Sequence, residues 1–193
     1  MSLETFVAVA AAIGLVFILV LFRRIRIPSS FMVRVLYVYD GDTIRVRSWR
    51  HGTFRVRIAF MDAPEGEQEF GEKSAEFLRS LVWGRRVLLK VHDLDYYGRF
   101  VAQVFVNGED AGLRLIAEGL AYVYRPYLKK LNPDAVSEYW SAQRRARSAR
   151  LGVWSSPRSE RPWDWRARHR SLFARMLFFL RRIWRTLRLV ICH

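Results

Sequence analysis

The chain has 193 residues, 51% of them hydrophobic, so it can bury the core of one ordinary domain with appendages at its ends. Its formal net charge of +15 excludes an ordinary acidic enzyme surface and favours a polyanionic partner, either nucleic acid or an anionic membrane. The single cysteine, Cys192, excludes an internal disulfide, and the four histidines lack the paired spacing of a zinc site.

An uncharged apolar stretch at residues 5–22 precedes three arginines at positions 23–26. A helix of this length nearly spans the hydrocarbon core of a bilayer, so we expect residues 1–26 to be a transmembrane anchor of a single-pass membrane protein. A cleaved secretory signal is the alternative, but Glu4 stands where such a signal has basic residues, and arginines stand where it would be cleaved. Residues 27–32 are expected to be a linker.

Strand-like alternation of apolar and polar residues begins at residue 33. The runs expected to be strands are residues 33–39, 43–48, 53–60, 86–92 and 99–106. The stretches with helical spacing are residues 72–82, 111–118 and 133–150. Asp40-Gly41 and His51-Gly52 are typical of tight turns and predict an antiparallel meander. The pattern predicts an α+β fold, mainly β, over residues 33–156: a five-stranded oligonucleotide-binding barrel with about three helices.

Residues 157–193 form a basic, aromatic C-terminal extension with ten arginines and only two acidic residues. Arginines interrupt an apolar stretch at residues 171–191, and the spacing predicts an amphipathic helix. Such a helix lies on a bilayer surface or on its own domain, and nucleic-acid binding is a third interpretation. Residues 33–156 have 20 basic and 15 acidic side chains, so more than half of the excess charge lies in the extension. We interpret most of that charge as facing lipid headgroups.

Three carboxylates lie at the ends of expected strands, where a barrel could bring them together. Asp42 follows the first strand, and Asp62 and Glu65 follow the third. Their oxygens suit a hard cation such as calcium or magnesium, although Asp-Gly and Asp-x-Pro-Glu are also ordinary turn and loop sequences. Arg57 and Arg99 stand nearby on strands, and their guanidinium groups could neutralise a phosphodiester in its transition state. Together these side chains predict a reaction centre.

These motifs resemble the staphylococcal (micrococcal) nuclease family, the thermonuclease-like domains. The resemblance covers residues 33–156. Its motifs are Tyr39-Asp-Gly-Asp-Thr43, Arg57 with Asp62-Ala-Pro-Glu65, Asp95-Tyr-Tyr-Gly-Arg99, Glu118-Gly-Leu-Ala-Tyr-Val-Tyr124 and Leu151-Gly-Val-Trp-Ser155. Pro162-Trp-Asp-Trp-Arg166 also resembles an extension common after this domain in bacterial members. The resemblance implies a calcium-dependent endonuclease, a hydrolase that cleaves DNA and RNA phosphodiesters and leaves 3′-phosphate ends.

The resemblance also implies a role for each site residue. Asp42 and Asp62 would bind Ca²⁺ through their side chains, with the backbone carbonyl of Ala63 as a third ligand. Glu65 would be the general base that activates the attacking water, or would order that water. The two arginines would hold the phosphate and offset its charge in the transition state. The substrate-binding residues would be Tyr97, Tyr122 and Tyr124, with a base stacked on a ring.

Two features depart from the family pattern. Ala63 stands where the founding enzyme has threonine, but only its carbonyl is needed, and the loop at residues 66–71 is short and acidic where a longer basic loop would help to hold substrate. Because the five catalytic and metal-binding side chains have the required residue types, we expect an active enzyme. The alternative is a catalytically weak protein that uses the same barrel to bind nucleic acid or as a membrane scaffold.

Two features of the sequence give opposing indications of the side of the membrane that the domain faces. The arginines at 23–26 would hold the domain in the cytoplasm by the positive-inside rule. The supply of calcium and the existence of secreted and membrane-tethered relatives favour the extracytoplasmic side, which we prefer. DNA and RNA are the expected partners, together with a membrane contacted through residues 5–22 and 171–191, and no protein partner is indicated.

Overall fold

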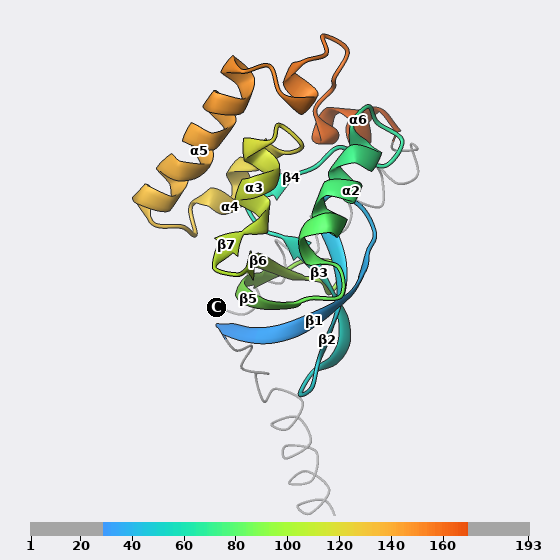
Figure 1. The fold of residues 1–193 in the computed structure, drawn as a ribbon, viewed down its shortest axis with the longest axis vertical. Helices are drawn as coiled ribbons and strands as arrows, with labels where there is room; N and C mark the ends of the chain where they lie inside the picture. The colour runs from blue at the N-terminus through green and yellow to red at the C-terminus, as the bar shows by residue number, and fades with distance from the viewer. Residues whose placement is uncertain (1–28, 170–193) are drawn as a thin grey trace, which may run out of the picture.

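The computed structural model describes residues 29–169, so the expected anchor and the expected amphipathic helix lie outside the described residues. Within residues 29–169, no helix is both long enough and apolar enough to cross a membrane. The described residues form a β-barrel with helices gathered at one end of it (Figure 1).

The barrel is built from five main strands and one short one. They are β1 (Ser30–Val38), β2 (Thr43–Ser48), β3 (Gly52–Ile58), β5 (Arg86–Leu94), β6 (Phe100–Val106) and the short β7 (Glu109–Asp110). Their order in the sheet is β3-β2-β1-β5-β6-β7, and an additional parallel pairing of β3 with β6 closes the sheet on itself. Inward-facing residues of each strand fill the core, because successive side chains alternate between the two faces. The predicted five-stranded barrel is thus confirmed.

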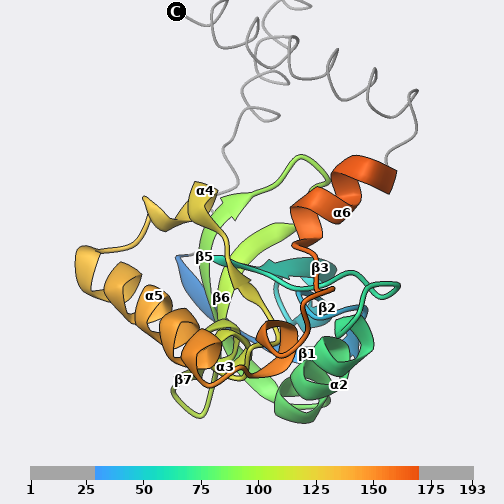
Figure 2. The ribbon, with the colours of Figure 1, turned by 90° about the horizontal axis from the view of Figure 1, so that it is seen from above.

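The three expected helices are present as α2, α3 and α5, and further elements connect them. The helices are α2 (Gly71–Val82), α3 (Ala111–Ala117), α4 (Arg125–Leu128), α5 (Pro133–Ser148), the 3₁₀ turn η1 (Gly152–Trp154) and α6 (Pro162–His169). Helix α5 begins at Pro133, and the side chain of Asn132 caps it by accepting from the backbone N–H of Ala135 at 2.8 Å. Two short strands, β4 (Met61–Asp62) and β8 (Tyr122–Val123), pair outside the barrel sheet. Figure 2 shows that α6 stands apart from the group formed by α2, α3 and α5.

Gly119 and Gly152 approach each other closely, and this contact attaches the C-terminal part of the domain to the chain just after α3. The backbone N–H of Val153 donates to the carbonyl of Gly119 at 2.8 Å. A Cβ on Gly119 would lie 2.3 Å from the carbonyl oxygen of Leu151, and its φ of +69° also favours glycine. This contact joins two of the sequence motifs and directs the chain after Trp154 back towards the end of the barrel.

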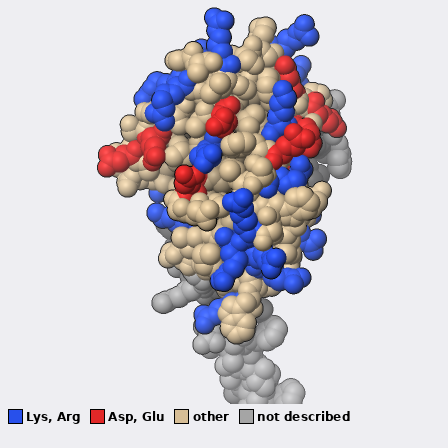
Figure 3. Space-filling view, viewed as in Figure 1, with Lys and Arg blue, Asp and Glu red and all other residues tan. Residues whose placement is uncertain are grey.

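The surface charge differs between the two ends of the molecule. Figure 3 shows lysines and arginines without acidic neighbours over the end where Figure 1 places β1 and β2. Acidic side chains lie among basic ones over the helical end. The surface over β1 and β2 is therefore basic without nearby acidic side chains, whereas charges of both signs mix over the helical end.

Candidate active site

Asp42 and Asp62 lie on either side of one guanidinium group, that of Arg57. Arg57 Nη1 donates to Asp42 Oδ2 and Arg57 Nη2 donates to Asp62 Oδ1, each at 2.5 Å. Both carboxylates are buried, and Asp62 has no exposed surface. Charge-assisted hydrogen bonds of this kind are among the strongest in proteins, so the pairing holds two like charges close together. The three residues meet as the sequence predicts.

Short local structures place these side chains. Arg57 lies opposite Thr43 in the antiparallel pairing of β3 with β2, and β4 carries Asp62 past the end of β3. In the turn before β2, the Asp40 side chain accepts from the backbone N–H groups of Asp42 at 2.9 Å and Thr43 at 2.6 Å. This hydrogen bonding fixes the turn in which Asp42 stands.

Gly41 lets the turn that carries Asp42 pack against the loop that follows Asp62. A Cβ on Gly41 would lie 2.6 Å from Ala63 Cβ and 2.7 Å from Ser74 Cβ, closer than real Cβ atoms approach. The glycine in the Asp-Gly-Asp motif is therefore required by the close contact of its turn with the loop at Ala63 and with helix α2. This role is more specific than turn formation.

The carboxylates of Asp40, Asp42 and Asp62 differ in the direction of their pKa shifts. Burial raises the pKa of Asp40 to about 7, and repulsion by Asp42 contributes to the rise. Burial also raises the pKa of Asp42, but Arg57 and the hydroxyl of Thr43 outweigh it, and the pKa lies below its ordinary value. Burial raises the pKa of Asp62, and the nearby guanidinium groups offset this only in part. Asp42 is therefore the carboxylate most firmly held in its charged form.

Arg99 is linked to Asp42 through one intervening residue, Thr43. Its Nε donates to Asp95 Oδ2 at 2.7 Å, and its Nη1 donates to Thr43 Oγ1 at 3.3 Å. Thr43 Oγ1 in turn donates to Asp42 Oδ1 at 2.7 Å. The second predicted arginine thus lies at the same site, tethered by Asp95 at the start of its own motif.

Glu65 is held by an arginine that the sequence analysis did not assign to the site. Arg166, in α6, donates from Nη1 to Glu65 Oε1 and from Nη2 to Asp62 Oδ2, each at 2.6 Å. A longer contact of 3.3 Å joins Nη1 to Asp62 Oδ1. Arg166 therefore links a predicted metal ligand to the predicted general base. Its only sequence signal is the Pro-Trp-Asp-Trp-Arg motif beyond the barrel.

Residues 156–169 form one wall of the site. The ring of Trp163 lies 5.8 Å from that of Tyr122 and 6.4 Å from that of Tyr124. Gln68, in the short acidic loop, donates from Nε2 to the carbonyl of Glu160 at 3.0 Å. The short loop and the described part of the extension are therefore in contact, and α6 is held where Arg166 reaches the carboxylates.

The three tyrosines predicted to bind substrate lie in different surroundings. Tyr122 is buried against Trp163, and its hydroxyl lies 3.2 Å from Ser159 Oγ. The Arg57 guanidinium lies 5.9 Å from the ring of Tyr124. Tyr97 is 70% exposed and lies beside Arg99. The rings of Tyr124 and Tyr97 thus lie beside the arginines of the site, whereas Tyr122 packs against the segment of residues 156–169.

The donor set of the site suits a weakly held hard cation. No group of three or more His, Cys, Asp or Glu side chains within residues 29–169 is arranged to hold a metal ion. The expected ligands are only two carboxylates and the Ala63 carbonyl, so waters and a substrate phosphate would complete the six to eight oxygens that calcium takes. Asp42 and Asp62 are buried and are both held by guanidinium groups, so they already favour positive charge between them. The residues fit a calcium site of low intrinsic affinity.

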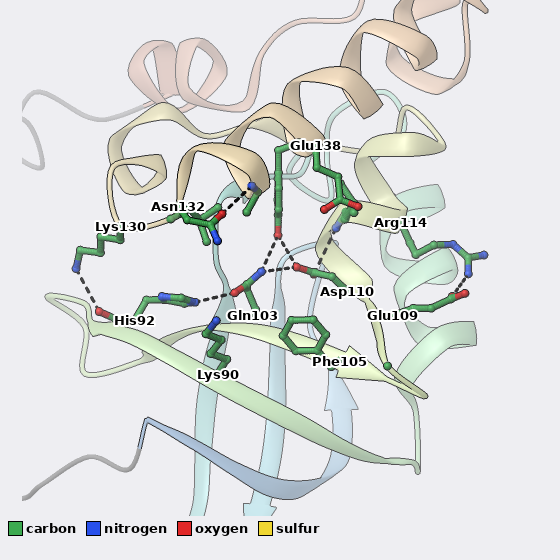
Figure 4. Close-up of a pocket in the computed structure, with 15 residues that line it drawn as sticks. Lys90, His92, Gln103, Phe105, Glu109, Asp110, Arg114, Lys130, Asn132 and Glu138 are labelled. Atoms are coloured by element: carbon green, nitrogen blue, oxygen red, sulfur yellow. Dashed lines mark hydrogen bonds and ion pairs between the residues drawn. The ribbon is translucent and has the colours of Figure 1, made fainter.

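One cavity of the described domain lies away from these residues. It has a volume of about 800 Å³ and is lined by residues of β5, β6, β7, α3 and α5, among them His92, Gln103 and Asp110 (Figure 4). None of the predicted site residues lines it. Its buried polar groups satisfy one another, because Gln103 bonds both His92 and Asp110. We assign the cavity no catalytic role.

Comparisons with known proteins agree with this geometry. The family model described as staphylococcal nuclease homologue matches residues 55–156. The chain is 33% identical over 170 residues to a micrococcal nuclease of Shigella flexneri, covering 82% of this chain and 90% of that protein. It is 37% identical over 136 residues to an uncharacterized endonuclease of Escherichia coli O157:H7, covering 70% and 84%. A Haemophilus influenzae endonuclease is 32% identical over 133 residues, covering 69% and 71%. The chain therefore belongs to the staphylococcal nuclease family and is a hydrolase of the nuclease class.

Proposed function

We propose that this protein is a calcium-dependent endonuclease that hydrolyses DNA and RNA phosphodiester bonds, leaves 3′-phosphate ends and is tethered to a membrane. The observation that carries the proposal is the single guanidinium of Arg57 held between the carboxylates of Asp42 and Asp62. Two carboxylates and an arginine at one point provide both the negative charge that attracts a hard cation and the donor that binds phosphate.

Each residue has a role in the proposed reaction. Glu65 accepts a proton from the attacking water, whose oxygen bonds to phosphorus while the bond to the 5′-oxygen breaks and that oxygen takes a proton from solvent. The phosphate then remains on the 3′-oxygen. Arg57 and Arg99 bind the other phosphate oxygens and offset the charge that builds up in the transition state. Asp42, Asp62 and the Ala63 carbonyl would hold the calcium ion, which would supply further positive charge when bound.

The test is cleavage of end-labelled single-stranded DNA and RNA by the full-length chain in neutral detergent. We expect cleavage with millimolar calcium and no cleavage with a chelator. The new 3′ ends of the products should accept a label only after a phosphatase has removed their 3′-phosphate. Arg57→Lys keeps the charge but loses the two-pronged contact, and it should slow cleavage by about 10²–10³-fold. Binding without cleavage in the unaltered protein would contradict the proposal and favour the weak binding protein.

The membrane part of the proposal rests on residues 5–22 and on the basic extension. We propose that residues 1–26 anchor the nuclease domain, residues 33–156, on the extracytoplasmic side, and that residues 171–191 lie against the membrane. Proteolysis of intact cells or spheroplasts tests the side, because an extracytoplasmic domain is cut without lysis. Protection until the membrane is broken would place the domain in the cytoplasm.

A further inference from the structure

Arginines form rows across the outer face of the barrel. Cross-strand partners share a face, and the pairing sets Arg34 opposite both Arg47 of β2 and Arg86 of β5. On the next row, Arg45 of β2 lies opposite Arg55 of β3. All five side chains are exposed. We call these residues, Arg34, Arg45, Arg47, Arg55 and Arg86, the arginine face.

The arrangement is electrostatically unfavourable by itself. Like charges directly opposite on neighbouring strands destabilise a sheet. Among the described residues, none of the five arginines makes a salt bridge with a carboxylate. Figure 3 shows this end of the molecule without acidic side chains among its basic ones. Three pairs of facing arginines that have no carboxylate partner within residues 29–169 indicate an external polyanion.

The arginine face continues directly from the reaction centre. Arg55 and Arg57 lie two residues apart on β3, so their side chains leave the same face of the strand. Exposed aromatic rings stand at this junction: Tyr37 and Tyr39 are in edge contact at 5.1 Å, and the Arg55 guanidinium lies 5.0 Å from the Tyr39 ring. Rows two residues apart are about 7 Å from each other, a spacing similar to that of successive phosphates in an extended strand.

We propose that the arginine face binds the phosphates of a single-stranded nucleic acid beyond the bond that is cleaved, with bases stacked on Tyr37 or Tyr39. The inference rests on the proposed function, because it assigns the path of the substrate that the reaction centre would cut. Continuity with Arg57 and the rings at the junction favour a nucleic acid over a bilayer, since stacked rings and basic grooves are the features of single-strand binding.

The test compares two variants that each remove four positive charges from the full-length chain in neutral detergent. The face variant carries Arg34→Gln, Arg45→Gln, Arg47→Gln and Arg55→Gln. The control variant carries Lys129→Gln, Arg144→Gln, Arg145→Gln and Arg150→Gln, all exposed and near or on α5. Affinity for a 20-nucleotide single strand is measured in chelator at several salt concentrations, and cleavage of a dinucleotide is measured with calcium.

We expect the face variant to bind the 20-nucleotide strand about 10²-fold more weakly in about 0.1 M salt. The slope of log affinity against log salt should fall by about 0.7 for each phosphate that is no longer neutralised, or about 3 in all. The control variant should keep the slope, and the dinucleotide should be cleaved at nearly equal rates by both, because it reaches only the reaction centre. Single changes Arg47→Gln and Arg55→Gln, each expected to lower the slope by about 0.7, keep the test decisive if the fourfold variant does not fold.

An unchanged slope in the face variant would overturn the inference. The same conclusion follows if that variant keeps strand affinity but loses binding to phosphatidylglycerol vesicles relative to phosphatidylcholine vesicles, which would assign the face to a membrane. Failure of the unaltered protein to cleave either substrate with calcium would instead refute the proposed function, while the binding slopes would still decide the role of the face.

Discussion

Two buried carboxylates in this protein, Asp62 and Asp110, are satisfied by different kinds of partner. Asp62 accepts from the guanidinium groups of Arg57 and Arg166. Asp110 caps α3 by accepting from the backbone N–H of Gly112 at 2.9 Å and also accepts from Gln103 Nε2 at 2.7 Å. It further accepts from the Tyr139 hydroxyl at 2.5 Å. One carboxylate is thus held by charged groups and the other by neutral ones.

The difference separates a site from a structural element. The donors to Asp110 come from the backbone and from buried neutral side chains, which cannot leave without unfolding part of the domain. Burial and the charge of Asp110 raise the pKa of Tyr139, so its hydroxyl stays protonated and donates. The donors to Asp62 are on long side chains, with 13% of Arg57 and 28% of Arg166 exposed. A guanidinium at the surface can exchange its carboxylate for a phosphate, while a cation takes its place.

The largest effect is expected from Asp62→Asn. We expect this change to slow phosphodiester cleavage by about 10³-fold, because it removes a charge that holds Arg57 and that would hold the proposed calcium ion. It should change the free energy of unfolding much less, since the amide keeps the shape of the side chain. Cleavage kinetics and urea unfolding measure the two effects. Retention of normal cleavage by this variant would place the reaction centre elsewhere.

At Asp110, we expect a large loss of stability and no change in cleavage, the opposite of the result at Asp62. Asp110→Ala removes the cap of α3 and leaves the Tyr139 hydroxyl and the Gln103 amide without their acceptor. We expect unfolding to become easier by about 3 kcal/mol, combining about 1 kcal/mol for the cap with about 1–3 kcal/mol for the unpaired buried groups. Cleavage by the folded protein should be unchanged. Tyr139→Phe is the matched control and should lose about 1 kcal/mol, and a specific loss of cleavage in either variant would contradict the comparison.

A smaller effect is expected from Arg166→Gln. Arg166 and a calcium ion would use the same oxygens of Asp62, so removal of the guanidinium should tighten calcium binding by about fivefold to twentyfold, the effect of one partly solvated charge a few ångströms away. Release of Glu65 from Arg166 also leaves the base able to accept a proton. Calorimetric titration with calcium measures the affinity. Arg168→Gln is the control, because Arg168 pairs with Glu160 and not with the site. Equal affinities in the two variants would mean that Arg166 and the ion do not compete.

The difference between the two carboxylates also explains what the sequence could predict. Asp42, Arg57 and Asp62 stand at or near the ends of regular strands, so alternation and turn residues indicated that a barrel could bring them together, and their hydrogen bonds show that they meet. Their individual roles came from the family resemblance. Arg166 could not be found in this way, because its position depends on the packing of Trp163 against Tyr122. It lies beyond the expected barrel, in a segment whose many arginines also suit a membrane surface.

The buried environment of Tyr122 could not be predicted for a similar reason. Strands β4 and β8 have only two residues each, too few to show an alternation, and their pairing depends on contacts across the fold. The Asp110 cluster was missed because its members come from separate elements and resemble ordinary polar residues of strands and helices. Tertiary contacts, and not local patterns, therefore distinguish the buried Tyr122 from the exposed Tyr97.

The smallest effect is expected from His92, whose Nε2 lies 2.9 Å from Gln103 Oε1 in the cluster around Asp110. Burial lowers the pKa of His92 from 6.5, because the protonated ring is less well solvated in the folded chain. Below pH 6.5 the unfolded chain then binds more protons, so the free energy of unfolding falls as the pH decreases through the folded-state pKa. Asp40 acts in the opposite sense, since its raised pKa makes the folded chain bind more protons.

The contribution of His92 is isolated by comparing the unaltered protein with His92→Gln, because the difference in their unfolding free energies cancels the contribution of Asp40. Measured in urea from about pH 5 to about pH 7.5, this difference should change with pH. A constant difference would mean that His92 accepts a proton as readily in the folded chain as in the unfolded chain, which the burial of its ring argues against.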